Sequence, residues 1–266
     1  MRIRFWLGFG LAWAVAAGAP CVAQVRVEVP APSGEINVTY TAPADEGQAA
    51  RLRDLAVRLK PRADQLYILD RIDIVIVHSV RELEQRLGPQ AAGALSGVSY
   101  VHGILFLSPL SWRGNPTSEA LEHEMEQALV RYAALQLAGG NRLPDWLEQG
   151  LVSVLTQRSF AITTAELVAR RASLLLAQRQ ADDPAIGYWA VRYLTEARGG
   201  LTPLRQLLRL VAQRPDSFVE NLQLVYGVPV GTLERDWRRW MNAEVEAEKK
   251  RREGGVRTGP LVKDRD

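Results

Sequence analysis

Apolar residues recur along the first part of this chain with the spacing of strands and helices in turn, and later with helical spacing alone. The segment 36–40 alternates like a strand, and the β-branched run 72–77 is typical of a buried central strand. Between them, residues 46–69 carry leucine and alanine at helical spacing. The segment 98–107 predicts a third strand. These patterns predict a small sheet with helices.

Local signals mark where several helices begin and end. Ser79 is a suitable N-cap for a short helix that stops at Gly88 and Pro89. Asn115 followed by a proline predicts the start of a long helix that ends at the glycine pair 139–140. Further helices are expected over 145–157, 165–179, 186–197, 203–212, 218–226 and 230–249.

The order of these elements predicts an α+β fold within one domain, residues 35–248. A small N-terminal sheet with helices (35–110) is followed by a mainly helical lobe (115–248).

The first 23 residues have the pattern of a secretory signal peptide, with cleavage expected before Gln24 and a short leader at 24–34. Arg2 and Arg4 form the basic start, and Phe5 to Ala19 the apolar run. An uncleaved membrane anchor is the alternative, but spanning a bilayer needs roughly 20 apolar residues. We therefore expect an exported protein, periplasmic or extracellular, without a stable membrane span after cleavage.

Charge and cysteine content narrow the class of protein. Cys21 is the only cysteine, so removal of residues 1–23 would leave neither disulfides nor thiolate metal sites. That removal would also leave 31 basic and 30 acidic residues, so the mature chain is almost neutral. The basic residues gather in the segment 249–266, which we expect to be a flexible tail. A near-neutral body with such a tail does not predict nucleic-acid binding.

The candidate chemistry lies in two segments. Residues 121–127 read Leu-Glu-His-Glu-Met-Glu-Gln, and residues 143–151 read Leu-Pro-Asp-Trp-Leu-Glu-Gln-Gly-Leu. In the H-E-x-x-H pattern of zinc peptidases, two histidines four positions apart share one helix face and bind the metal. The glutamate between them activates the zinc-bound water, and a third ligand comes from another element.

The pair of segments resembles the gluzincin zinc peptidases, in particular the peptidase MA-like domains, whose second motif reads P-x-W-L-x-E-G. Pro144, Trp146, Leu147 and Gly150 match that motif, and the similarity covers about residues 36 to 242. The resemblance implies a gluzincin-like fold, a zinc site and a cleft in which an extended peptide lies along an edge strand.

Carried over by this resemblance, His123 occupies the first metal-ligand position and Glu124 the general-base position. The second and third ligand positions hold Gln127 and Gln149. A carboxamide oxygen is a neutral, weak ligand, whereas protein zinc sites use imidazole, thiolate or carboxylate. These degenerate positions predict that no cofactor is bound.

Neighbouring glutamates leave an alternative open. Glu126 lies near the same face of the helix as His123, and Glu148 adjoins the third ligand position. Either could complete a rewired zinc site, and both are equally suited to be solvated surface charges.

Other residues are weaker candidates. Tyr188 is placed to line the cleft as an oxyanion-stabilising tyrosine, or to pack in the core beside Trp189. His78 and His102 are expected to be structural or surface histidines. The candidate peptide-binding edge lies in the segment 98–107, at Ser99, Tyr100, Val101, His102 and Gly103.

Two functions follow from this pattern. The first is an exported pseudopeptidase, a non-catalytic domain that keeps a cleft for a peptide or protein ligand. The alternative is an active zinc metallopeptidase in which Glu126 or Glu148 joins His123 and Glu124. The sequence leaves the ligand and the oligomeric state open.

Overall fold

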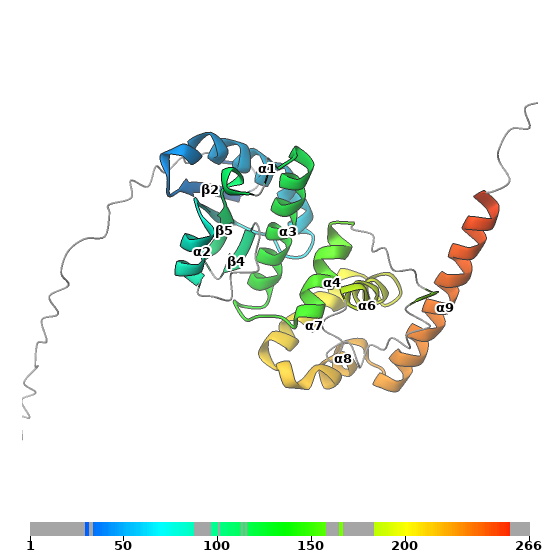
Figure 1. Ribbon diagram of the computed structural model, residues 1–266. Helices are drawn as coiled ribbons and strands as arrows, with labels where there is room; N and C mark the ends of the chain where they lie inside the picture. The colour runs from blue at the N-terminus through cyan, green and yellow to red at the C-terminus, as the bar shows by residue number, and fades with distance from the viewer. Residues whose placement is uncertain are drawn as a thin grey trace, which may run out of the picture.

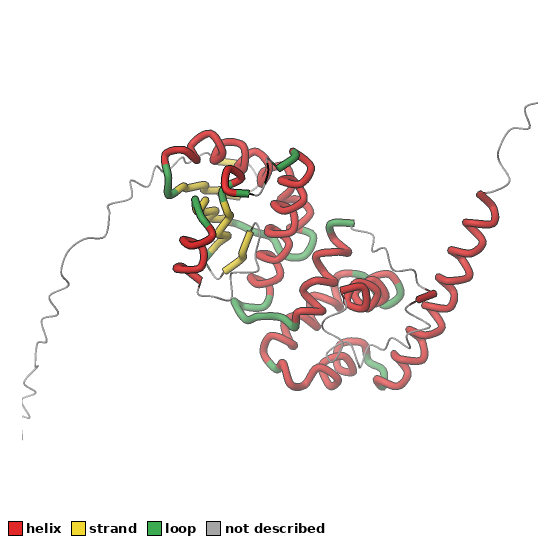
Figure 2. Tube along the Cα trace, viewed as in Figure 1, coloured by secondary structure: helices red, strands yellow, loops and turns green. Residues whose placement is uncertain are grey.

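The computed structural model describes residues 30–31, 34–87, 97–100, 102–112, 114, 116–157, 165–166 and 184–255. Strands occupy one part of this structure, and the other part consists of helices (Figures 1 and 2). The expectation of a small sheet with helices followed by a mainly helical part is therefore confirmed. The expected signal peptide, most of the leader and most of the expected helix 165–179 lie outside the described residues.

The sheet has five strands in the order β1-β2-β3-β5-β4. The central strands β2, β3 and β5 are parallel, whereas β1 and β4 lie antiparallel at the two edges. The β-branched run thus forms the central strand, as expected. The bounds are β1 (Pro30–Ala31), β2 (Gly34–Tyr40), β3 (Arg71–Val77), β4 (Gly97–Tyr100) and β5 (Gly103–Leu107).

Helices cover both faces of the sheet. On one face, α1 (Glu46–Asp64) packs beside β2, and α3 (Ser118–Leu137) packs beside β4 and against α1 (Figure 1). Ile72, Ile74 and Ile76 of β3 are fully buried beneath these helices, as the period-two side-chain alternation of a strand requires. The short helix α2 (Val80–Leu87) covers the other face through Leu83.

The single strand expected over residues 98–107 is wrong, because the structure forms a hairpin there. Tyr100 pairs with Gly103 across the turn, so β4 is an edge strand and β5 lies inside the sheet. Gly103 has a φ of 154°, and a Cβ added to it would lie 2.2 Å from the backbone oxygen of Asp73. A residue with a side chain cannot take this place, so glycine permits the turn.

Two helix ends differ from expectation. Helix α1 ends at Asp64 rather than near residue 69, and the Asp64 carboxylate then accepts the backbone N–H of Leu69 at 3.1 Å. Helix α3 begins after Thr117, whose side chain accepts the N–H of Ala120 at 3.1 Å. Thr117 therefore replaces the expected cap at Asn115, which lies outside the described residues. The expected cap at Ser79 is confirmed by its bond from the N–H of Glu82.

The helical part consists of α4 (Asp145–Leu155), α6 (Pro184–Glu196), α7 (Leu201–Gln213), α8 (Phe218–Tyr226) and α9 (Val230–Gly255). Helix α4 packs closely along α6, and Trp146 is buried with its ring edge against Phe218. Helix α9 leads away from this group and continues past Lys249, the expected end of the last helix (Figure 1).

Candidate functional site

The first half of α3 carries His123, Glu124 and Gln127. The helix places His123 and Gln127 one turn apart on the same side, which is the arrangement that the motif predicts. His123 and Glu124 are half-buried, and Gln127 is 6% exposed. The side chains are therefore held in a partly enclosed place rather than in open solvent.

A chain of hydrogen bonds joins three side chains on this side of α3. Arg131 Nη2 donates to Gln127 Oε1 at 3.0 Å, and Gln127 Nε2 lies 2.7 Å from His123 Nε2. The arginine can only donate, so it fixes which end of the amide points toward His123. The amide nitrogen can also only donate, so His123 Nε2 accepts and the neutral ring carries its proton on Nδ1. Gln127 thus engages the lone pair that a metal would need.

An ion pair joins Arg131 to Glu148, in the first turn of α4. Arg131 Nε lies 3.6 Å from Glu148 Oε1. Burial raises the pKa of the Glu148 carboxyl above its ordinary value, while Arg131 acts in the opposite direction. A guanidinium cation therefore lies between α3 and α4, in contact with Gln127 and Glu148.

Glu126 lies on a different side of α3. It is 5% exposed and forms an ion pair with Arg62 of α1, and Glu122 pairs with Arg58 of the same helix at 2.8 Å. A solvated surface charge at Glu126 is therefore excluded. Its carboxylate is engaged in holding α1 against α3, which also weighs against its use as a metal ligand.

Zinc does not fit the donors on this side of α3. The two ligand positions on α3 hold one imidazole with an engaged lone pair and one neutral carboxamide bonded to a guanidinium, whereas zinc needs several free nitrogen, sulfur or anionic oxygen ligands. Across the described ranges, no three His, Cys, Asp or Glu side chains come together in a way that could hold a metal ion.

Two other expected site residues lie on α4 and α6. Gln149 follows Glu148 on α4 and is half-buried, and its backbone oxygen accepts the hydroxyl of Ser153 at 2.8 Å. Tyr188 lies on α6, which packs mainly against α4, and its ring meets Trp189 edge-on at 5.2 Å between centroids. This contact agrees with packing beside the core.

The expected peptide-binding edge is divided by the hairpin. Ser99 and Tyr100 belong to the edge strand β4, His102 lies in the turn, and Gly103 begins the interior strand β5. Val101 lies outside the described residues. Of the expected segment, β4 is therefore the part that lies at an edge of the sheet.

Helix α3 holds β4 from one face of the sheet. The hydroxyl of Ser99 donates to the backbone oxygen of Ala128 at 3.0 Å. A Cβ added to Gly97 would lie 3.1 Å from the Cβ of Ala128, so the strand lies close to the helix. Position 128 of α3 therefore faces β4, one residue after Gln127.

The charged side chains of α3 divide between two opposite sides. Glu122 and Glu126 face α1, which lies over β2. Arg131 follows Glu122 by nine positions, which is about 180° around a helix of 3.6 residues per turn. Since β4 is at the end of the sheet away from β2, Arg131 lies on the side of α3 beyond β4.

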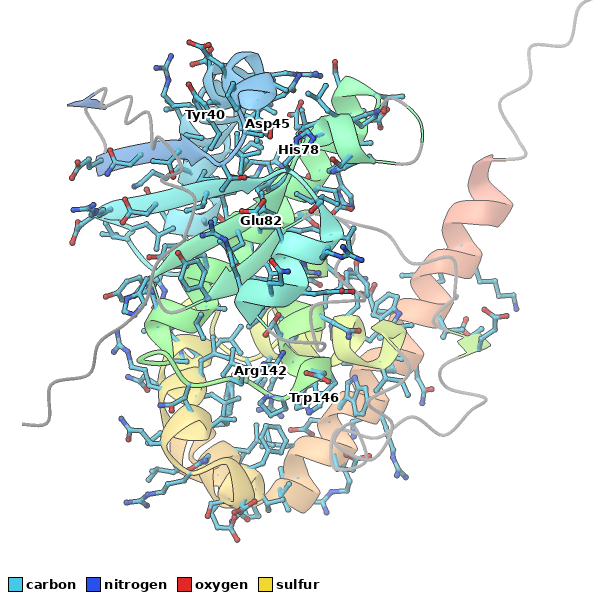
Figure 3. All side chains as sticks on the ribbon, turned by 60° about the vertical axis from the view of Figure 1, so that its left-hand side comes forward. Tyr40, Asp45, His78, Glu82, Arg142 and Trp146 are labelled. Atoms are coloured by element: carbon cyan, nitrogen blue, oxygen red, sulfur yellow. The ribbon has the colours of Figure 1, made fainter. Side chains whose placement is uncertain are left out.

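A second polar centre, which the sequence did not reveal, lies where β2, β3 and β5 end. The Asp45 carboxylate is fully buried, and it accepts the Ser108 hydroxyl and faces His78 Nδ1 at 3.0 Å. Glu82 accepts the backbone N–H of His78 at 3.1 Å. In Figure 3, Asp45, His78 and Glu82 lie in the upper half of the view, and Arg142 and Trp146 lie below them. His78 is thus a structural histidine of this centre, with part of its ring exposed.

No protein-family model and no curated protein matches this chain. Within the described ranges, none of the helices is both long and apolar enough to cross a membrane.

Proposed function

We propose that this chain is an exported, gluzincin-like pseudopeptidase that binds an extended peptide along β4 and does not cleave it. The observation that carries the proposal is the bond from the Gln127 amide to His123 Nε2, held in place by Arg131. The residues at two ligand positions are thereby tied to each other and to a cation. A domain of this kind retains the shape of a peptidase cleft and lacks the donors for its metal.

The geometry of β4 supports peptide binding by strand addition. In a hairpin closed by two residues, the pair next to the turn exchanges both hydrogen bonds, and the following pair directs its backbone groups outward. Tyr100 pairs with Gly103, so Ser99 and Gly97 are expected to direct theirs away from β5. Among the described residues, β4 pairs on one side only. An extended peptide can hydrogen-bond to the other side.

The side of α3 that bears Gln127 and Arg131 adjoins this free edge. A peptide beside β4 would run along it, in the place where a peptidase holds its substrate over the metal. The proposal therefore joins one edge strand and one helix side into a single binding cleft.

Peptide binding tests the strand-addition part of the proposal. We expect a fluorescein-labelled octapeptide of alternating valine and threonine to bind, as measured by fluorescence anisotropy. Ser99→Pro should weaken binding at least tenfold, because proline removes the outward N–H. Ser99→Ala is the matched control, since it removes the hydroxyl that bonds to Ala128 and keeps the N–H. Equal loss in both variants, with unchanged melting temperatures, would contradict binding at this edge.

Zinc content tests the non-catalytic part. Elemental analysis of the purified protein after dialysis should give far less than one zinc per chain, and general peptide substrates should remain intact. One tightly held zinc per chain would instead favour the rewired peptidase, and Glu148→Ala should then release the metal.

A further inference from the structure

Arg131 brings a positive charge to the side of α3 that adjoins the free edge of β4. Its Nη2 donates to Gln127 at 3.0 Å, and its Nε faces Glu148 at 3.6 Å. These contacts use only part of the five N–H donors of a guanidinium. The side chain is 29% exposed, so the group is anchored and still open to solvent.

Glu148 compensates this charge incompletely. The separation of 3.6 Å is too long for a hydrogen bond, so the pair lacks the directed contact of a strong ion pair. A cation beside a peptide-binding edge and not fully neutralised by its neighbour attracts an anionic group from the ligand.

We infer that the peptide bound along β4 carries a carboxylate and that Arg131 binds it. This inference rests on the proposed function and names the ligand class of the same cleft. A guanidinium binds a carboxylate through two parallel hydrogen bonds, so Arg131 supplies both charge and geometry. The side-chain amide of Gln127 accepts one N–H group of Arg131 and bonds to His123 at its other end. Gln127 and His123 therefore help to fix the position of the guanidinium.

A carboxylate on a peptide has two sources, the C-terminus and an acidic side chain, and the test separates them. Three octapeptides of alternating valine and threonine serve as probes: the free acid, the C-terminal amide, and the amide with one central threonine replaced by glutamate. We expect the free acid or the glutamate peptide to bind about tenfold tighter than the plain amide, the gain of one charge-assisted contact. The peptide whose affinity increases identifies the source of the carboxylate.

Variants show whether Arg131 is responsible. Arg131→Gln should remove the advantage of the carboxylate peptide over the plain amide, because only the carboxylate uses the guanidinium. Arg131→Lys keeps the positive charge but not the two parallel N–H donors of the guanidinium. It should therefore retain a smaller preference for the carboxylate peptide. Arg142→Gln is the matched control, since Arg142 is an exposed arginine that also influences Glu148.

The outcomes distinguish this inference from the function on which it rests. If the plain amide binds the unmodified protein as tightly as both carboxylate peptides, strand addition stands and the role of Arg131 is wrong. An advantage that persists in Arg131→Gln also contradicts that role. If none of the peptides binds, the proposed function itself fails. The comparison of the three peptides needs no variant, so it remains decisive even where Arg131→Gln does not fold.

Discussion

Gly150 of α4 lies directly against Gly187 of α6. A Cβ at position 150 would stand 2.3 Å from the backbone oxygen of Gly187, and one at position 187 would stand 2.2 Å from that of Trp146. Both distances are far below van der Waals contact, so the two helices pack through their backbones. The glycine that ends the W-L-x-x-G segment therefore has a packing role, independent of any metal.

Replacement of this glycine should destabilise the protein. Gly150→Ala inserts a methyl group between two rigid backbones, and we expect the free energy of unfolding to fall by about 3 kcal/mol. The matched control is Gly47→Ala in α1, where a Cβ meets no atom within 4 Å and should add up to about 1 kcal/mol of stability. Urea denaturation measures both. A neutral Gly150→Ala would show that α4 and α6 are further apart than described.

The buried carboxylate at the strand ends makes a second stability prediction. Asp45→Asn replaces one acceptor by an amide donor facing Ser108 or His78, so we expect a loss of about 1–3 kcal/mol in the free energy of unfolding. Asp54→Asn is the control, because Asp54 is 73% exposed and should change stability by less than about 0.5 kcal/mol. Equal effects of the two changes in thermal denaturation would contradict a structural role for Asp45.

Glu148 should give the protein a measurable pH dependence. Burial raises its pKa in the folded state above the ordinary 4.5, so the folded state holds the proton more tightly than the unfolded state. The contribution of Glu148 to the free energy of unfolding should therefore fall as the pH rises from about 4 to about 7, by no more than about 1 kcal/mol for a partly exposed group.

The variant Glu148→Gln removes this titration. Its stability relative to the unmodified protein should improve as the pH rises across that range. Glu119→Gln, at an exposed position in the first turn of α3, should show no comparable trend. Denaturation at several pH values measures the difference, and a relative stability of Glu148→Gln that falls with pH would refute the prediction.

Rebuilding the ligand set should restore zinc binding. In the double variant Gln127→His with Gln149→Glu, Arg131 still places a cation at the site, so we expect a weak zinc response. Adding Arg131→Gln should give a rise in melting temperature of about 5 °C or more at a hundredfold excess of zinc over its Kd. His123→Ala in the triple variant is the control that should abolish the rise. A triple variant that folds without any zinc-dependent shift would show that the three positions do not converge.

The sequence predicted the elements that local pattern determines. The β-branched run 72–77 became the central strand, and Ser79 capped the following helix, because periodicity and capping act over a few residues. The hairpin was missed because strand-forming residues lie on both sides of the turn, and the close approach of Gly103 to Asp73 depends on a neighbouring strand.

Which side chains meet at the candidate site could not be predicted, because this depends on contacts between elements that are distant in the sequence. Arg131 lies four positions after Gln127 in the sequence, but its position toward α4 depends on how Glu148 is packed. The centre at Asp45 joins groups up to 63 residues apart, and the register of parallel strands brings them together. Such long-range pairings leave no periodic pattern that a single sequence can reveal.

If a peptide pairs with β4 as proposed, the tight turn at Gly103 also restricts how it can pair. Because Tyr100 pairs with Gly103 next to the turn and Ser99 is bonded to α3, β4 cannot slide along β5 by one residue without losing both contacts. A peptide added as a strand would therefore pair with β4 in a fixed register. Successive side chains of the bound peptide would point alternately toward α3 and away from it. The cleft would therefore distinguish peptides by which residues occupy the odd-numbered and which the even-numbered positions.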